Sequence, residues 1–467
     1  MIPLSLEAVA AAVGGRLCDV PDPSTLMTAP AAVDSRAVQP GGLFAALPGE
    51  HTDGHTFAAG AVQAGAVAVL AARPVGVPAV VVDDVLDALA ALARSVLTAV
   101  PQAMVIGLTG SAGKTSTKDL IAQVLPELGE TIATVQSFNG EIGMPLTVTH
   151  LDQGVRYLVL EMGARGIGHI AHLTRIAPPT VGLVLNVGTA HVGEFGGREQ
   201  IAQAKGELVE ALPAHGLAIL NADDPLVAAM ASRTRARVLT FGTKTDSDVR
   251  AVDVALDTSG RASFTLTAAG AQARVDLTLH GAHQVSNALA AAAVAIGLGA
   301  DVDKTAAALS RAVLVASGRM EVTDRPDGVR IINDAFNANP DSMKAAFTTL
   351  EAMTGGRRTI AIMGEMKELG DSGSEEHRHV GRLVAAASIH VLIAVGGDDA
   401  CAMAAAAQQD NPQLNVVHAR DRDHALTLAR HLIQPGDIVL VKGSHSVELE
   451  HTAQRMARLD MAGGGSL

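Results

Sequence analysis

Val105-Ile-Gly-Leu-Thr-Gly-Ser-Ala-Gly-Lys-Thr-Ser-Thr117 is the stretch around which the chain is organised. The apolar run at residues 104–108 predicts a buried strand, and a helical pattern of apolar residues follows the Lys-Thr pair. A strand, a glycine-rich turn and a helix that opens on Lys-Thr form the layout of a phosphate-binding loop. Glycines let backbone N–H groups converge on phosphate oxygens, and the helix N-terminus adds a favourable dipole. We therefore predict that Lys114 reaches the terminal phosphates of a nucleotide and that the Thr115 hydroxyl binds Mg²⁺.

The loop departs from the general pattern G-x-x-x-x-G-K-[ST], because Leu108 stands where that pattern needs its first glycine. The glycines lie instead at positions 107, 110 and 113, a spacing that argues against an ordinary small GTPase or kinase. A simple glycine-rich turn with a solvated lysine is disfavoured, since a strand pattern and a helix pattern flank the loop. The predicted nucleotide-binding residues of the loop are Gly110, Ser111, Ala112, Gly113, Lys114, Thr115 and Ser116.

Composition limits the classes of protein to which the chain can belong. At 467 residues it should hold about two to four domains. A formal net charge of −13 makes non-specific nucleic-acid binding a poor hypothesis. The two cysteines lie far apart, at positions 18 and 401, which favours a reducing compartment over a disulfide framework. With no basic and apolar leader and no uninterrupted apolar run of about 18 residues, we expect a cytoplasmic protein without membrane insertion.

Turn residues and apolar runs divide the chain into three α/β units. Residues 1–100 alternate short apolar runs with turns, and residues 101–314 carry the phosphate loop and a series of strand and helix patterns. Near-continuous apolar strands in this second unit predict a parallel sheet covered on both faces, with an antiparallel patch between residues 249 and 279. Further alternation of strands and helices in residues 315–467 predicts a separate doubly wound domain.

Two candidate metal ligands follow strands of the second unit. Ligands of open parallel sheets bind at the carboxyl ends of the strands, and the phosphate loop, Glu161 and His191 all follow predicted strands. A carboxylate and an imidazole near Thr115 are suitable Mg²⁺ partners, directly or through water. Taken singly, Glu161 could equally be a solvated turn carboxylate and His191 a loop histidine. Their shared placement favours a function.

Lys205 lies inside an apolar stripe of a helix predicted over residues 197–212. At about 100° per residue, it falls between Ile201 and Leu208, on the face that should be buried. A lysine there must snorkel, pair with an anion or lose its charge. A desolvated amine can be chemically modified or act as a nucleophile. The alternative is a snorkelling lysine at the edge of the face.

Polar residues also cluster at strand ends of the third unit. Asp334, Asn337 and Asn339 follow one predicted strand, where they could bind ribose hydroxyls or an amide-rich substrate. Asn339 could equally cap the helix that follows it. Lys442, after the last predicted strand, could hold a carboxylate. Arg319, at the junction of the second and third units, is either a linker residue or a cation that reaches a phosphate across the cleft.

A set of short motifs runs in order along nearly the whole chain: Asp34-Ser-Arg36, Thr109-Gly-Ser-Ala-Gly-Lys-Thr115, Glu161-Met-Gly163, Ala190-His191, Ala204-Lys-Gly-Glu207, His283 to Asn287, Gly318-Arg319 and Asp334 to Pro340. Together they resemble the Mur ligases, which form amide bonds with ATP in peptidoglycan precursor synthesis. Within the family, the segments at 137–147, 334–343 and 363–370 are most similar to the members that add D-alanyl-D-alanine to a UDP-N-acetylmuramoyl-tripeptide. The Asp-Asn-Pro-Arg motif of the third-residue-adding ligase is not visible.

The resemblance implies a UDP-binding N-terminal domain, a central ATPase domain and a Rossmann-like C-terminal domain. It implies that ATP activates a carboxylate to an acyl phosphate, that the amine of D-Ala-D-Ala attacks, and that a tetrahedral intermediate releases phosphate. The expected partners are the UDP-N-acetylmuramoyl-tripeptide and D-Ala-D-Ala, with no nucleic acid, and we expect a monomer.

The resemblance also implies roles for individual residues. Lys114 would bind the γ-phosphate, Thr115 and Glu161 would hold one Mg²⁺, and His191 with a carbamylated Lys205 would hold a second. The implied catalytic residues are Lys114, His191, Lys205 and Arg319. The implied nucleotide contacts outside the loop are Asn287 to adenine, Asp334 to ribose and Arg319 to the phosphates. The implied substrate residues are Ser35 and Arg36 at the uridine diphosphate end, and Asn139, Asn337 and Lys442.

The residues themselves support part of this assignment, because carbamylation needs a neutral amine, which a lysine in an apolar stripe can supply. The family pattern is broken at Phe336, where tyrosine is usual, and at Gly140, where a second asparagine is common. Two alternatives stay open: another Mur-type amide ligase, such as the third-residue-adding enzyme, and a nucleotide-binding switch that forms no bond. Lys205 discriminates between the two, because a nucleotide-binding switch has no need of a lysine in an apolar stripe beside a metal. Since Arg319 and Asp334 come from the third unit, we expect domain closure to complete the site.

Overall fold

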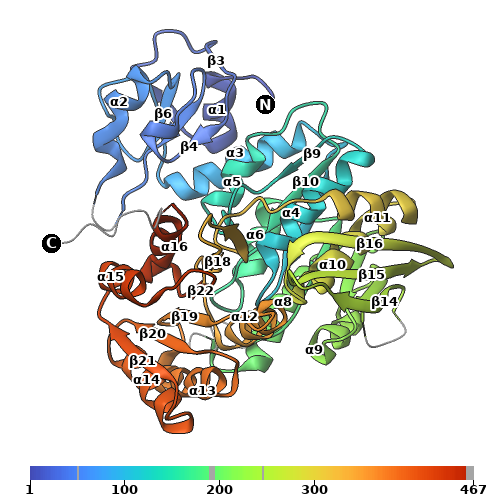
Figure 1. The fold of residues 1–467 in the computed structure, drawn as a ribbon. Coiled ribbons are helices and arrows are strands. Elements are labelled where there is room, and N and C mark those ends of the chain that lie inside the picture. The colour runs from blue at the N-terminus through green and yellow to red at the C-terminus, as the bar shows by residue number, and fades with distance from the viewer. Residues whose placement is uncertain (50–51, 189–194, 244–246, 459–467) are drawn as a thin grey trace.

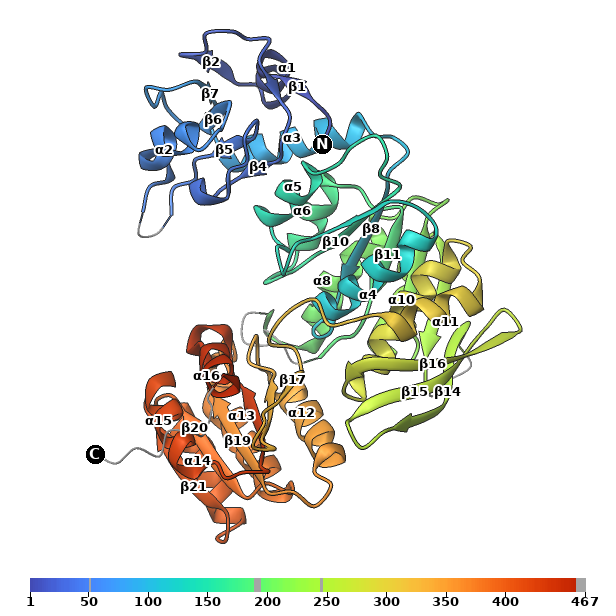
Figure 2. The same cartoon turned by 45° about the horizontal axis from the view of Figure 1, so that its top comes forward.

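The computed structural model describes residues 1–49, 52–188, 195–243 and 247–458. Within these residues the chain forms three α/β domains in succession, each built on its own main sheet (Figure 1). Figure 2 separates them by colour into a blue N-terminal domain, a central domain that runs from cyan through green to yellow, and an orange and red C-terminal domain. The predicted fold class is confirmed, whereas the boundaries at residues 100 and 314 stay predictions. None of the helices in the described residues is long and apolar enough to cross a membrane.

The N-terminal domain is built from short strands and helices. Its elements are β1 Leu4–Ser5, α1 Leu6–Val13, β2 Arg16–Cys18, β3 Leu26–Met27, β4 Ala31–Ala32, η1 Ser35–Ala37, β5 Leu43–Ala45, η2 Gly54–Phe57, α2 Ala58–Gln63, β6 Ala68–Ala71, β7 Ala79–Val81 and α3 Val85–Thr98. The main sheet runs in the order β2-β7-β6-β5-β4, in which only β2 pairs antiparallel. β1 and β3 form a separate antiparallel pair.

The central domain carries the longest sheet. Its elements are β8 Met104–Thr109, α4 Lys114–Val124, η3 Leu125–Glu127, β9 Thr131–Ala133, α5 Gly143–Val148, β10 Tyr157–Glu161, α6 His169–Ile176, β11 Val181–Val184, α8 Arg198–Glu210, β12 Leu217–Asn221, α9 Pro225–Ala228, η4 Ala229–Arg233, β13 Arg237–Gly242, β14 Val249–Leu256, β15 Arg261–Ala268, β16 Ala271–His280, α10 His283–Gly297 and α11 Val302–Arg311. The strand order is β16-β15-β14-β13-β12-β11-β8-β10-β9. The predicted antiparallel patch is confirmed as β14–β16, and it extends the parallel sheet because β14 pairs parallel with β13.

The C-terminal domain repeats the alternation of strands and helices. Its elements are β17 Glu321–Asp324, β18 Arg330–Asn333, α12 Pro340–Met353, β19 Thr359–Gly364, η5 Gly370–Ser372, α13 Gly373–Ala386, β20 Val391–Val395, α14 Asp398–Asp410, β21 Asn415–Ala419, α15 Arg422–Leu432, β22 Ile438–Lys442, η6 His445–Val447 and α16 Leu449–Ala457. The order is β17-β18-β22-β19-β20-β21. The predicted parallel strands are present as β18 to β22, and β17 adds an antiparallel edge strand that the sequence pattern did not reveal.

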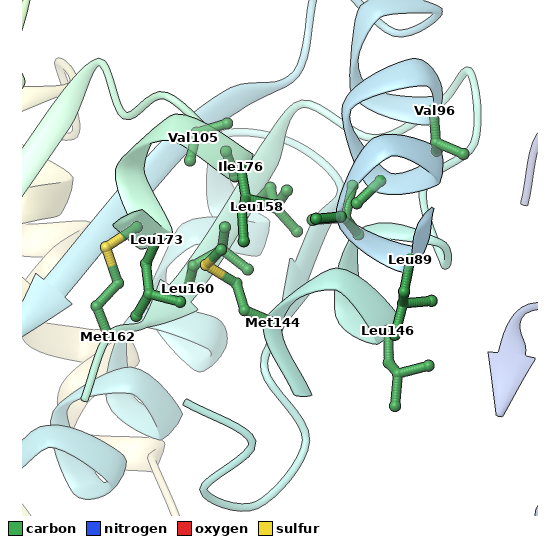
Figure 3. Packing of buried hydrophobic residues seen from close by; sticks show 14 of the residues in the cluster. Leu89, Val96, Val105, Met144, Leu146, Leu158, Leu160, Met162, Leu173 and Ile176 are labelled. Atoms are coloured by element: carbon green, nitrogen blue, oxygen red, sulfur yellow. The ribbon is translucent and has the colours of Figure 1, made fainter. Parts of the chain in front are cut away.

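Helix α3 joins the first two domains through a continuous apolar core. Leu89 and Val96 on α3 belong to the same buried cluster as Leu146 of α5 (Figure 3). The backbone N–H of Ala31 also donates to the Thr149 hydroxyl across this junction, at 3.1 Å. The N-terminal domain is therefore packed against the wall of the central domain that carries α5 and α6.

Substitution of Leu89 tests whether this shared core stabilises both domains. Leu89→Ala should lower the free energy of unfolding by about 2–5 kcal/mol, because it removes a fully buried side chain and leaves a cavity. The exposed Arg94 on the same helix provides the control, and Arg94→Ala should change stability by less than about 0.5 kcal/mol. Chemical denaturation measures both. Equal effects of the two changes would contradict a shared core at α3.

Candidate active site

The phosphate loop begins where strand β8 ends. β8 pairs parallel with β10 and β11, and in this register Leu108 lies opposite Glu161 and Leu183. Leu108 is fully buried in the core of the central domain. The strand thus continues through Thr109, and the loop starts only at Gly110, which explains why an apolar side chain stands where the general pattern has glycine.

Gly113, the N-cap of α4, is a position where only glycine fits. Its φ of +81° is left-handed, and a Cβ atom would collide with the side-chain oxygen of Asn287 on α10. That oxygen accepts a hydrogen bond from the Thr117 hydroxyl at 3.2 Å, while the Asn287 amide donates to Gln284 at 2.9 Å. The residue predicted to contact adenine is therefore held directly against the phosphate loop.

Thr115 and Glu161, the predicted ligands of one Mg²⁺, lie together. The Thr115 hydroxyl donates to Oε2 of Glu161 at 2.8 Å, and the Asn139 side-chain amide donates to Oε1 at 2.8 Å. The Ser137 hydroxyl lies 3.0 Å from the Thr115 hydroxyl. Both carboxylate oxygens are thus oriented by side chains from separate segments.

Arg319 reaches this cluster from the junction with the C-terminal domain. Its Nη2 donates to the Thr115 hydroxyl at 2.9 Å and to the Ser137 hydroxyl at 3.3 Å. Its guanidinium lies 4.2 Å from the ring centroid of Phe336. Left-handed φ angles at Gly318 (+72°) and Met320 (+57°) flank the arginine and turn it toward the loop. Burial lowers the pKa of Arg319, while the nearby carboxylate of Glu161 opposes that shift.

A partly buried ion pair in the C-terminal domain supports the Arg319 turn. Lys442 Nζ donates to Oδ2 of Asp334 at 2.7 Å and to the backbone carbonyl of Asn337 at 2.9 Å. The other oxygen of Asp334 accepts the Met320 N–H at 3.1 Å. Lys442 therefore holds a carboxylate, as its type and place indicated, but that carboxylate belongs to Asp334. The substrate contact of Lys442 and the ribose contact of Asp334 stay predictions.

Two lysines face the cluster from the central domain. Lys205 is 4% exposed on α8, so its predicted burial is confirmed. Burial, together with the charge of Lys114, lowers the pKa of Lys205 well below its usual value, which favours the neutral amine. Burial also lowers the pKa of Lys114, and Glu161 opposes this shift. Lys114 Nζ donates to the Gly110 carbonyl at 2.9 Å.

Nearly all the predicted site residues line one cavity of about 1160 Å³. They come from the central domain and from the C-terminal domain, so both contribute walls. The predicted residues in the lining are Gly110, Ser111, Ala112, Gly113, Lys114, Thr115, Ser116, Asn139, Glu161, Lys205, Asn287, Arg319, Asp334, Asn337 and Lys442.

Two predicted residues, Ser35 and Arg36, are not among those that line this cavity. Ser35 and Arg36 lie on η1 of the N-terminal domain, where the exposed Arg36 pairs with Asp34 at 2.7 Å. Val33, close by in the sequence, does line the cavity. His191 lies outside the described residues, so its predicted metal contact stays a prediction.

Sequence reasoning missed two residues that shape the site. Asn186 accepts the Ala112 N–H at 2.8 Å and donates to the Ala112 carbonyl at 3.1 Å, which fixes the middle of the phosphate loop. Ser137 bridges Thr115 and Arg319. Asn186 follows strand β11 at the loop edge of the sheet, and this placement was a usable signal, whereas Ser137 lies in an irregular connection that carries no periodic pattern.

The donors at Thr115 and Glu161 fit Mg²⁺. Their oxygens lie 2.8 Å apart, and the position already accepts a cationic group, the Arg319 guanidinium. Among the residues that the structure describes, no group of three His, Cys, Asp or Glu side chains could hold a metal ion. Mg²⁺ commonly binds through one or two carboxylates, water and the phosphates of a substrate, and this donor set is compatible with that mode.

Models of the Mur ligase family match the chain over three segments. The segments are 32–97 for "Mur ligase family, catalytic domain", 108–295 for "Mur ligase middle domain" and 318–445 for "Mur ligase, glutamate ligase domain". The chain is 46% identical to the UDP-N-acetylmuramoyl-tripeptide–D-alanyl-D-alanine ligase of Mycobacterium tuberculosis (strain H37Rv), over 99% of each protein. It is 34% identical to the protein of that name from Bacillus subtilis, over 96% of this chain and 97% of the other.

Solved structures give the same result. MurF from Acinetobacter baumannii superposes with a TM-score of 0.87 at 32% identity, over 98% of this chain and 100% of that one. MurF ligase from Thermotoga maritima, in complex with ADP, superposes with a TM-score of 0.78 at 29% identity, over 92% and 99%. The sequence, the order of the domains and the residues gathered in the cavity agree, and the chain belongs to the Mur ligase family.

Proposed function

We propose that this chain uses ATP to join D-alanyl-D-alanine to a UDP-N-acetylmuramoyl-tripeptide, which forms the pentapeptide precursor of peptidoglycan. Relatives that carry this activity in their name match the chain over nearly its full length. The observation that carries the proposal is the cavity itself. It combines a phosphate loop, a buried lysine of lowered pKa and an arginine from the following domain. The monomeric state and the cytoplasmic location stay predictions.

The reaction consists of two transfers. A carboxylate oxygen of the tripeptide attacks the γ-phosphorus of ATP, and ADP leaves with the electron pair of the broken P–O bond. The amine nitrogen of the dipeptide then attacks the acyl carbon. The resulting tetrahedral intermediate expels phosphate, the nitrogen loses a proton, and the amide bond remains.

The side chains around the phosphate loop can perform the phosphoryl transfer. The loop amides and Lys114 would bind the phosphates, because N–H groups and an ammonium converge there. The Arg319 guanidinium, 2.9 Å from the Thr115 hydroxyl, would stabilise charge that develops on the transferred group. Asn287 and Asp334, which also line the cavity, would hold the nucleoside.

Outside the loop, the substrate would be bound by residues of all three domains. Asn139, Asn337 and Lys442 line the cavity and would contact the peptide substrates. Ser35 and Arg36, in the N-terminal domain, would contact the uridine diphosphate end.

Thr115 and Glu161 would hold one Mg²⁺, and a carbamylated Lys205 with His191 a second, which would neutralise phosphate charge. The buried amine supports this role for Lys205. A neutral amine nitrogen attacks CO₂, a proton is released, and the carbamate that forms is an oxygen ligand suited to Mg²⁺.

The substrate requirement is the direct test of the proposed ligase. Phosphate should be released only when ATP, the UDP-N-acetylmuramoyl-tripeptide and D-Ala-D-Ala are all present, because each transfer needs the product of the preceding one. Phosphate release and the mass of the nucleotide-linked product measure this. Equal turnover with a single free diamino acid in place of D-Ala-D-Ala would favour the third-residue-adding ligase instead.

Lys205→Ala tests the carbamate. Ligation should fall by at least about a hundredfold, because a metal ligand is lost, and added short carboxylates should restore part of it. In the wild-type protein, burial lowers the pKa of Lys205, which favours the neutral amine. As the pH falls through that lowered pKa the amine gains a proton, and both the carbamate and the activity should be lost.

Lys304→Ala is the matched control for that variant, because Lys304 is an exposed lysine on α11 of the same domain. It should keep full activity and show no response to carboxylates. Full ligase activity of Lys205→Ala would refute the carbamate role, while loss of activity with no rescue by any carboxylate would favour a different role for the amine.

A further inference from the structure

The helix that carries Lys205 also carries a buried carboxylate to which the mechanism gives no role. Glu207 is 8% exposed, and its position two residues after Lys205 turns it to a different side of α8. A buried carboxylate is costly unless hydrogen bonds satisfy it. Its contacts therefore indicate what it does.

Glu207 caps a neighbouring helix. Its Oε1 accepts the backbone N–H of Gly168 at 2.5 Å, and its Oε2 accepts the backbone N–H of Ala171 at 2.9 Å. Gly168 is the N-cap of α6, with a left-handed φ of +92°, and has no side chain to bind the amides of the first turn. The carboxylate of a different helix takes that place, and its negative charge also suits the helix N-terminus.

The capped segment forms one wall of the active-site cavity. Ala164, Arg165, His169 and His172 all line it, between strand β10 and the body of α6. At the start of this segment, the N–H of Gly163 donates to the Asn139 carbonyl at 2.8 Å. The segment is thus held near Glu161 at one end and by Glu207 at the other.

This wall lies toward the N-terminal domain, to which the proposed function assigns the uridine diphosphate end of the muramoyl peptide. Helices α5 and α6 lie on the side of the central domain that faces the N-terminal domain (Figure 2). Asn287, Asp334 and the phosphate loop, which would hold ATP, form other parts of the cavity. A displacement of the α6 segment should therefore disturb the muramoyl peptide more than the nucleotide.

Helix α8 is itself fixed at the residue between Lys205 and Glu207. Any side chain at Gly206 would overlap the guanidinium of Arg233. Arg233 donates to the backbone carbonyls of Ala202 at 3.0 Å and Gln203 at 2.8 Å. The turn that carries Lys205 is thus anchored from outside, and the position of Glu207 follows from it.

We propose that Glu207 is a positioning residue that joins the Lys205 helix to the α6 wall of the cavity. It would thereby fix the position of the peptide substrate relative to the buried amine. The proposal rests on the proposed ligase function for its kinetic consequence. Its structural part, the dependence of the α6 N-terminus on Glu207, does not need that function.

Glu207→Gln separates positioning from packing, because it keeps the shape of the side chain. One amide oxygen can still accept a hydrogen bond, but the NH₂ group faces a second N–H donor. The KM for the UDP-N-acetylmuramoyl-tripeptide should rise about tenfold, equivalent to ~1.4 kcal/mol, while the KM for ATP stays within about twofold. Backbone hydrogen exchange over residues 163–172 should accelerate, with α8 unchanged.

Glu199→Gln, an exposed glutamate on the same helix, makes the identical charge change and should alter neither the KM values nor the exchange. Unchanged exchange over 163–172 in Glu207→Gln would overturn the proposal. Equal losses for both substrates with a lower Tm would also overturn it, since these indicate packing alone. If Glu207→Gln does not fold, Glu207→Asp is measured by exchange, where local loosening supports the proposal and global loosening overturns it. If the wild-type protein fails to ligate, the proposed function is refuted, but the hydrogen-exchange test of Glu207 stays valid.

Discussion

The active site depends on the parallel register of β8 and β10. Because Leu108 lies opposite Glu161, the phosphate loop and the carboxylate leave the sheet at the same edge. A shift of one residue would turn the Glu161 side chain to the other face. At 1% exposure this carboxylate needs partners, and Thr115 and Asn139 provide them within 2.8 Å. The hydrogen bond between Thr115 and Glu161 is thus the direct product of strand pairing, and other contacts at the loop are built on it.

At the junction between the central and C-terminal domains, a strained turn positions Arg319 against the phosphate loop. A left-handed non-glycine residue such as Met320 costs on the order of 1–3 kcal/mol, so other contacts must maintain it. Here the Met320 side chain is buried, and its N–H binds Asp334, which Lys442 holds in turn. The turn is therefore fixed by the C-terminal domain, while its arginine bonds Thr115 of the central domain. Any rotation between the two domains must move this guanidinium relative to the phosphate loop.

Local patterns were sufficient for much of this arrangement. Strand ends predicted the positions of Glu161 and the phosphate loop, and the stripe on α8 predicted the burial of Lys205. The pairing of Lys442 with Asp334 could not be predicted, because the two residues are 108 positions apart and either could have faced a ligand. Ser137 was missed because an irregular connection has no period. The roles of Ser35 and Arg36 at the uridine diphosphate end came from resemblance alone and stay predictions, because these two residues do not line the main cavity.

A buried lysine such as Lys205 constrains the helix that carries it more strongly than an exposed site residue does. Burial lowers the pKa of Lys205, and this shift persists only while the packing around α8 excludes water. The residues that follow Lys205 meet this demand in different ways: Gly206 admits the Arg233 guanidinium, and Glu207 binds the first turn of α6. A looser helix would let water reach the amine and weaken the shift of its pKa. The sequence Lys205-Gly-Glu207 is therefore best understood as one unit, in which the chemistry of the first residue depends on the packing of the other two.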